Sequence, residues 1–333
     1  MRTVLLWLAL GFKIAWHKGE RGRVLNWIGA VLRDWLSPTG VPGVTVSITA
    51  ERIRKLKEEC RTLLDEVDLV PKSRVRQLAG LATWITGVMP QMGAFTSMLW
   101  AAINTGSRDT VSVSQLRRAL IWISTLCGES FKAVERHCRP RAKYFSLITF
   151  DGSLTGGGAT LQVGLSSLDE AEKAPIVSYW HDRWTDDEFR LLDTVPGDPG
   201  GQAKFEAFTL LCSLATWQST LAGSQGTLAV LGDALGVLYD VTKLRAKEPT
   251  LNALAAEMAL LLAPIGMDLR AAHVWTQRNR ICDTLSRLQK GSGPSHLTSG
   301  PQNLLRELPE LSKAHRVVRQ CPEGAILRSL KTV

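Results

Sequence analysis

The chain has 333 residues, of which 45% are hydrophobic and 21% are charged. This composition is that of an ordinary globular protein, which excludes a wholly disordered, collagen-like or coiled-coil chain, and six cysteines are too few for a disulfide scaffold. The net charge of +9 favours a polyanionic partner.

The charge is distributed unevenly along the chain. Residues 1–150 hold 22 basic and 11 acidic residues (net +11), residues 151–290 hold 12 and 17 (net −5), and residues 291–333 hold 6 and 3 (net +3). No stretch resembles a membrane span or an export signal, and the cysteines form no metal-binding pair. We therefore expect a cytoplasmic or nuclear protein that is not secreted and does not bind membranes.

The first third of the chain predicts a short β region followed by helices. Apolar alternation between residues 5 and 28, with a turn at 19–22, predicts a hairpin, and residues 44–48 predict another strand. An amphipathic helix is expected over 50–67, with Thr49 as its N-cap. Further helices are expected over 74–87, 94–104 and 113–127.

These helices carry many basic residues, including Arg52, Lys55, Arg74 and Arg76. Two interpretations remain open, because basic residues spread over several helices serve solubility as often as they contact phosphates. The excess of positive charge in this half gives the phosphate-binding interpretation its weight.

From residue 143 the pattern becomes mixed. Strands are expected over 144–150, 160–164, 175–180, 227–231 and 269–275, and helices over 203–218, 234–245, 250–263 and 280–288. Residues 185–201 predict a loop. This order is typical of an α/β layer architecture with a mixed sheet and flanking helices. The composition of residues 291–300 predicts a flexible linker, and a basic tail follows it.

Four acids stand out by their position. Asp151 and Asp233 end apolar strands, while Glu206 and Asp283 lie near the starts of helices. Helix capping would explain single members of this set, but not the ordered set. Strand ends and neighbouring helices can bring such side chains together, and four hard oxygen donors suit two Mg²⁺ or Mn²⁺ ions.

The motifs around these acids resemble the ribonuclease H domain of retroelement reverse transcriptases. Residues 150–159 (FDGSLTGGGA) resemble its opening hairpin, and residues 205–207 and 231–236 resemble the segments with its second and third acids. Residues 273–287 resemble the closing motif with the fourth acid, except that Trp275 and Thr276 replace the usual Pro-Gly turn. The resemblance implies that Asp151, Glu206, Asp233 and Asp283 bind metal and that His273 assists catalysis.

The resemblance extends upstream and implies the domain organisation. Residues 1–48 look like a remnant of the palm of a reverse transcriptase, 49–142 like its helical thumb and connection, and 143–290 like the ribonuclease H domain, followed by the linker and tail at 291–333. The implied partner is an RNA–DNA hybrid, contacted by Asn279 and by the basic residues of the helices. The upstream polymerase region of the same polyprotein is a further expected partner.

The implied activity is metal-dependent hydrolysis of the RNA strand of the hybrid. Polymerase activity is not expected from this chain alone, because the polymerase metal motif of the family would lie before residue 1. The alternative is a non-catalytic remnant that binds nucleic acid without cutting it. A weaker third reading is another ribonuclease H-like protein, such as an integrase or an exonuclease.

Overall fold

The structure, a computed structural model, describes most of the chain. The described residues are 22–27, 29–36, 42–66, 68–127, 134–137, 145–167, 170–171, 173–222, 227–265, 268–288, 304 and 306–322. The described helices include none with the length and apolar character needed to cross a bilayer.

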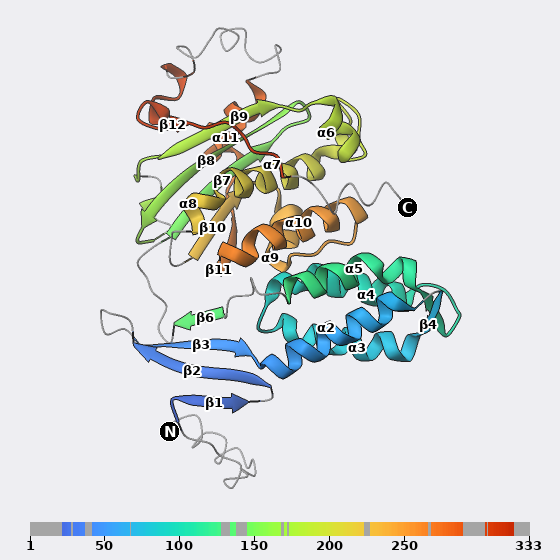
Figure 1. Ribbon diagram of the computed structural model, residues 1–333. Coiled ribbons are helices and arrows are strands. Elements are labelled where there is room, and N and C mark those ends of the chain that lie inside the picture. The colour runs from blue at the N-terminus through green and yellow to red at the C-terminus, as the bar shows by residue number, and fades with distance from the viewer. Residues whose placement is uncertain are drawn as a thin grey trace, which may run out of the picture.

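An antiparallel sheet begins the described part of the chain (Figure 1). Its spatial order is β1-β2-β3-β6, formed by β1 (Val24–Trp27), β2 (Ala30–Leu36), β3 (Pro42–Ile48) and β6 (Val134–His137). The predicted strand at 44–48 lies within β3. The predicted strand near residue 24 is β1, but it forms a hairpin with β2, and its expected earlier partner lies outside the described residues.

A helical module follows. It consists of α2 (Ala50–Asp65), α3 (Lys72–Thr86), η2 (Pro90–Met92), α4 (Gly93–Asn104) and α5 (Val113–Leu126), with a short pair of strands, β4 (Leu69–Pro71) and β5 (Thr110–Ser112). The spacing of Leu56, Cys60 and Leu63 buries one face of α2, as amphipathicity predicts. Thr49 is the N-cap residue of α2, as predicted, but its side chain makes no capping hydrogen bond.

The second half forms a mixed sheet of spatial order β11-β10-β7-β8-β9-β12. Its strands are β7 (Phe145–Gly152), β8 (Gly156–Leu165), β9 (Ser178–Arg183), β10 (Thr227–Gly232), β11 (Asp268–His273) and β12 (His315–Arg316). Strands β7, β8 and β9 are antiparallel neighbours, whereas β10 is parallel to both β7 and β11.

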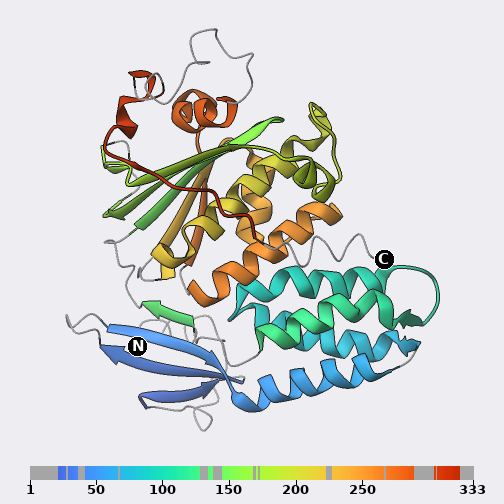
Figure 2. The ribbon, with the colours of Figure 1, turned by 45° about the horizontal axis from the view of Figure 1, so that its top comes forward.

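Helices cover both faces of this sheet. They are α6 (Asp186–Leu191), α7 (Gln202–Thr216), α8 (Gln218–Ala222), α9 (Leu235–Lys243), α10 (Pro249–Ile265) and α11 (Arg280–Arg287), with short η4 (Pro199–Gly201) and η5 (Thr276–Arg278). Figure 2 shows α11 on one face and α7 and α10 on the other. The predicted α/β architecture, a mixed sheet with flanking helices behind a mainly helical module, is confirmed.

One difference concerns α6, which lies in a stretch predicted as a loop. The Thr185 side chain accepts a hydrogen bond from the Glu188 backbone, and the Glu188 side chain accepts one from the Thr185 backbone. This capping box stabilises a helix too short to show apolar periodicity in the sequence.

The helical module and the α/β part share one hydrophobic core. Helix α10 packs against α4, which is also visible in Figure 2. The contact includes a hydrogen bond of 3.4 Å between Ser97 and Asn252, and Gly93 approaches the backbone of Lys243. The buried side chains of both parts form a continuous cluster. The basic and acidic halves of the sequence are therefore packed against each other.

The described residues within 304–322, which belong to the predicted basic tail, pack onto the α/β part. Leu304, Leu308 and Leu311 are buried against Ile176 and Leu285. The short helix η6 (Pro309–Leu311) leads into β12, which extends the large sheet beside β9. Three leucines are enough to hold so short a segment. The apolar pattern that they leave in the sequence is therefore weak.

Three consecutive glycines in β8 allow helices to approach the sheet from both sides. A Cβ atom at Gly157 would lie 2.7 Å from the Thr209 hydroxyl of α7, and one at Gly158 would lie 2.4 Å from Leu285 of α11. The turn of the hairpin itself is made by residues 153–155, where the Ser153 amide bonds to the Gly156 carbonyl at 2.8 Å. Gly156, Gly157 and Gly158 therefore serve close packing, and the turn lies before them.

Gly158→Ala is expected to destabilise the protein by about 1–3 kcal/mol, because the added methyl group overpacks the contact with Leu285. Gly80→Ala is the matched control. It lies within α3 with open space around it and should stabilise by about 0.5–1 kcal/mol. Urea unfolding of both variants measures the two changes. Equal effects would show that α11 does not pack against β8 as described.

Candidate metal centre

Three carboxylates from three elements meet at one edge of the large sheet. Asp151 lies near the end of β7, Asp233 directly follows β10, and Glu206 lies on α7. The strands β7 and β10 are parallel, with Thr149 opposite Leu231, so their carboxyl ends lie side by side. One carboxylate oxygen from each residue lies within 4.8 Å of the other two. The structure thus brings together three of the four predicted acids.

Glu206 is held in place by contacts with the opening hairpin. Its carboxylate accepts hydrogen bonds from the Gly152 amide at 3.2 Å and from the Gln202 side chain at 3.1 Å. Gln202 also donates to the Gly152 carbonyl at 2.6 Å. A Cβ atom at position 152 would lie 2.6 Å from the Phe205 carbonyl oxygen, so glycine after Asp151 is what permits α7 to approach this closely.

Asp151 is oriented by α11 on the opposite face of the sheet. The Ser286 hydroxyl donates a hydrogen bond to the Asp151 carboxylate, and Ser286 is fully buried. Ser153 in turn donates to the Ser286 carbonyl at 2.9 Å. Sequence reasoning quoted Ser286 in the closing motif but gave it no role. Its position three residues after Asp283, on the same face of a helix, was the available signal.

Asp283, the fourth predicted acid, lies outside the three-carboxylate cluster. It forms an ion pair of 2.5 Å with Arg287, one turn further along α11. It is still close enough to Asp151 to repel its negative charge. Asp283 therefore borders the cluster as half of an ion pair.

The pKa values of two clustered acids, Asp151 and Glu206, are raised. Burial, followed by repulsion from Asp233 and Asp283, raises the pKa of Asp151 to about 6. Burial, followed by repulsion from Asp151 and Asp233, also raises the pKa of Glu206 well above its ordinary value. Asp151 and Glu206 are only 4% and 3% exposed. Bringing these anions together out of water is unfavourable unless a cation compensates them.

The donor set fits a divalent cation. All three ligands offer hard carboxylate oxygens, which suit Mg²⁺ or Mn²⁺ rather than softer metals. Among the described residues, no lysine or arginine forms an ion pair with Asp151 or Glu206 that would otherwise neutralise them. Carboxylates buried in this way are usually paired or bound to a metal.

His273 and Asn279 occupy different environments near the site. His273 ends β11 opposite Gly232, the residue before Asp233, and its ring packs edge-on against Trp275 at 5.1 Å. Asn279 is 1% exposed and donates a hydrogen bond to the Phe150 carbonyl at 3.0 Å. The buried Asn279 side chain holds α11 to β7, so its position does not support the predicted contact with nucleic acid.

The predicted basic residues of the helical module differ in their interaction partners and in their exposure. Arg74 forms an ion pair with Glu66 at 2.9 Å, and the Arg52 guanidinium lies 4.3 Å from the centre of the Trp84 ring. Lys55 and Arg76 are exposed. Only the last two present their charge to solvent without a described acidic or aromatic partner.

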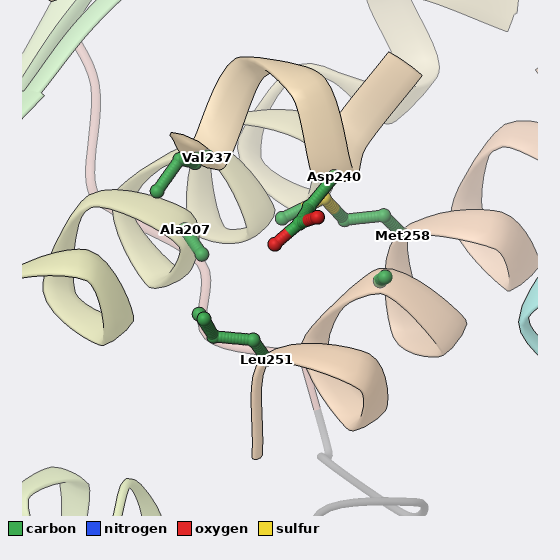
Figure 3. Close-up of a pocket in the computed structure, with 6 residues that line it drawn as sticks. Ala207, Val237, Asp240, Leu251 and Met258 are labelled. Atoms are coloured by element: carbon green, nitrogen blue, oxygen red, sulfur yellow. The ribbon is translucent and has the colours of Figure 1, made fainter. Parts of the chain in front are cut away.

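A separate hollow contains another partly buried carboxylate, that of Asp240. It is a small, partly open hollow lined by Ala207, Val237, Asp240, Leu251, Ala255 and Met258. Figure 3 shows the Asp240 carboxylate facing apolar side chains from α7 and α10. Burial raises the pKa of Asp240. Its lining includes none of the three clustered acids, so it is distinct from the candidate metal centre.

No family model matches the sequence, and no curated protein matches it. Among solved structures, ribonuclease H1 of the halophilic archaeon Halobacterium salinarum NRC-1 is 18% identical with a TM-score of 0.33, and the match covers 45% of this chain and 99% of that chain.

A foamy viral protease-reverse transcriptase in complex with RNA/DNA hybrid is 12% identical with a TM-score of 0.27, covering 76% of this chain and 29% of that chain. One in complex with dsDNA is 13% identical with a TM-score of 0.28, covering 77% and 45%. The chain thus spans less than half of these viral proteins. Matches with such low TM-scores carry no argument. The description of the fold is therefore based on the strand order, and that of the site on the positions of its residues.

Proposed function

We propose that the chain is a divalent-metal-dependent nuclease that hydrolyses the RNA strand of RNA–DNA hybrids. The supporting observation is the cluster of Asp151, Glu206 and Asp233, whose carboxylate oxygens lie within 4.8 Å of one another at the carboxyl edge of two parallel strands. Ligand sites in α/β sheets gather at this edge. The same cluster would have little structural value, because it places like charges together.

The residues in and around the three-carboxylate cluster have different proposed roles. Asp151, Glu206 and Asp233 would hold the metal, with Asp283 at the border of the site. Divalent ions held there would supply Lewis-acid chemistry, namely activation of a water molecule and stabilisation of the oxygen that leaves the scissile phosphate. Ser286 and Gln202 keep the carboxylates of Asp151 and Glu206 in position through the hydrogen bonds described above.

His273 is proposed to act at the border of the centre. It lies across from Gly232, next to Asp233, on the edge where the carboxylates meet. An imidazole there is suited to moving a proton or assisting departure of the product. Its half-buried ring is held in place by packing against Trp275.

The basic half of the chain is proposed to hold the hybrid. Residues 1–150 carry a net charge of +11, and Lys55 and Arg76 expose their charges on α2 and α3. Phosphate contacts of this kind provide affinity without sequence specificity. Selection of a hybrid would come from groove shape and the 2′-hydroxyl groups of the RNA strand.

We further propose that the chain is the ribonuclease H part of a retroelement reverse transcriptase. Residues 1–48 and 49–142 would be the palm remnant and the thumb and connection, and the upstream polymerase region would be a partner. The antiparallel sheet followed by four helices supports this organisation. Binding of a separately produced polymerase segment tests it.

The experiment uses the full chain with a hybrid in which either strand is labelled, alongside double-stranded DNA and single-stranded RNA. Cleavage of the hybrid RNA strand only, with Mg²⁺ and not with a chelator, is expected. The Asp151→Asn protein, purified identically, controls for a contaminating nuclease. Salt-sensitive binding of the hybrid without cleavage would overturn the proposal in favour of a non-catalytic binding protein.

A further inference from the structure

The end of the described chain is fastened across the α/β part as a strap, here residues 315–321. Its strand β12 pairs with β9, and the Val317 amide then bonds to the Tyr179 carbonyl at 2.9 Å. Beyond the strand, the Gln320 amide donates to the Thr216 hydroxyl at 2.9 Å. The strap therefore runs from the edge of the sheet to the end of α7, as Figure 1 shows in red.

A buried arginine anchors the strap. The Arg319 side chain is 7% exposed and bonds to Asp182 at 3.2 Å and to Glu188. Its guanidinium also lies 5.3 Å from the centre of the Trp184 ring. Because both partners of the Arg319–Glu188 pair are buried, the position of the strap is closely defined.

Two cysteine thiols meet beneath this anchor. Cys212 is fully buried on α7, one turn before Thr216, and Cys321 follows Gln320 at the exposed end of the strap. The bond from the Gln320 amide to Thr216 places Cys321 beside the end of α7, and the neighbouring Cys321 thiol adds to the effect of burial in raising the pKa of Cys212. Arg319 donates to the Cys212 sulfur at 3.7 Å. Two cysteines 109 positions apart in the sequence thus lie next to each other, one on α7 and one on the strap.

We propose that Cys212 and Cys321 are a redox modification site, at which a disulfide locks the strap to α7. Neighbouring thiols on two elements that are fastened to each other need little movement to reach the bonding distance of a disulfide. The inference does not depend on the proposed nuclease activity, because it uses none of the clustered acids.

The oxidant belongs to the class of low-molecular-weight disulfides, such as oxidised glutathione. The Cys321 thiolate attacks one glutathione sulfur, forms a mixed disulfide and releases one glutathione thiolate. Cys212 then loses its proton, attacks the Cys321 sulfur and releases the second glutathione. Two protein thiols are oxidised while one glutathione disulfide is reduced to two thiols.

The environments of the cysteines favour this order of attack. Cys321 is exposed, whereas Cys60, Cys127, Cys212 and Cys282 are buried. Burial raises the pKa of Cys212, but the Arg319 guanidinium opposes that effect and stabilises the thiolate when the proton leaves. Cys321 therefore reacts with the oxidant first, and Cys212 is the resolving thiol.

The test treats the full chain at low concentration with oxidised glutathione, alkylates the remaining thiols and identifies linked peptides by mass spectrometry. A Cys212–Cys321 peptide is expected as the main intramolecular link. It should raise the melting temperature by about 5 °C or more, because it closes a long loop, and dithiothreitol should reverse the change.

Cys321→Ser should abolish both the link and the thermal shift. In that background, Ser312→Cys places an exposed thiol elsewhere on the tail and should not restore either. Because position 321 is exposed, the serine variant should fold normally. Capture of Cys321 only as a mixed disulfide with glutathione, or only in a link between molecules, would overturn the proposal.

Discussion

Asp151→Asn is expected to reduce Mg²⁺-dependent cleavage of the hybrid RNA strand by at least about 100-fold. Loss of an outer partner of a metal ligand already costs about 10–100-fold, and Asp151 is proposed as a direct ligand. Asparagine preserves the size of the side chain and removes the negative charge. Initial rates with a labelled hybrid at saturating Mg²⁺ measure the loss.

The matched control is Asp240→Asn. Asp240 is also partly buried with a raised pKa, but it lies in the separate hollow between α9 and α10. Its replacement should change the rate by no more than about threefold, because it touches none of the clustered acids. Equal rates for Asp151→Asn and the wild-type chain would remove the metal centre from the mechanism.

The geometry also predicts a graded response among the acids. Glu206→Gln should match Asp151→Asn, because both side chains belong to the three-carboxylate cluster. Asp283→Asn should cost only about 10-fold, since Asp283 borders the cluster in an ion pair with Arg287. Parallel rate measurements distinguish the two classes. Equal losses at Glu206 and Asp283 would indicate four equivalent ligands.

Much of this arrangement could be predicted from the sequence. Asp151 and Asp233 each follow an apolar strand, and parallel strands end at a common edge, so their convergence follows from the strand pattern. Glu206 lies in a helix that follows the antiparallel strands β7, β8 and β9. It was predicted as a ligand from its order among the acids. The local pattern did not show that Asp283 would be neutralised by Arg287, because an ion pair within a helix forms only in one choice of rotamers.

The remainder depends on contacts between residues far apart in the sequence. The bond from Ser286 to Asp151 and the anchoring of Arg319 between Glu188 and Trp184 each join distant elements. Local propensity carries no signal for such contacts. The same applies to Asn279, which was predicted to contact nucleic acid and whose buried side chain bonds to the Phe150 carbonyl at 3.0 Å.

In the absence of divalent metal at pH 7, Asp151→Asn is expected to be more stable than the wild-type chain by about 1–3 kcal/mol. The pKa of Asp151 is about 6 in the folded chain and near its ordinary value of 3.8 when unfolded. Between these values the folded state binds more protons than the unfolded state. The stability of the wild-type chain should therefore fall as pH rises from about 4 to about 6 and stay lowered above that, a penalty of about 3 kcal/mol for this group.

Urea unfolding in a chelator at pH 7 and at pH 4.5 measures this difference, which should narrow at the lower pH. Asp109→Asn, at an exposed loop position, is the control and should leave the pH dependence unchanged. Mg²⁺ should then raise the melting temperature of the wild-type chain at pH 7, because it binds the folded state and compensates the crowded carboxylates. The rise should be smaller at pH 5, where protons compete, and nearly absent in Asp151→Asn. A variant less stable than the wild-type chain without metal, or equally stabilised by Mg²⁺, would mean that the three acids are not a cation site.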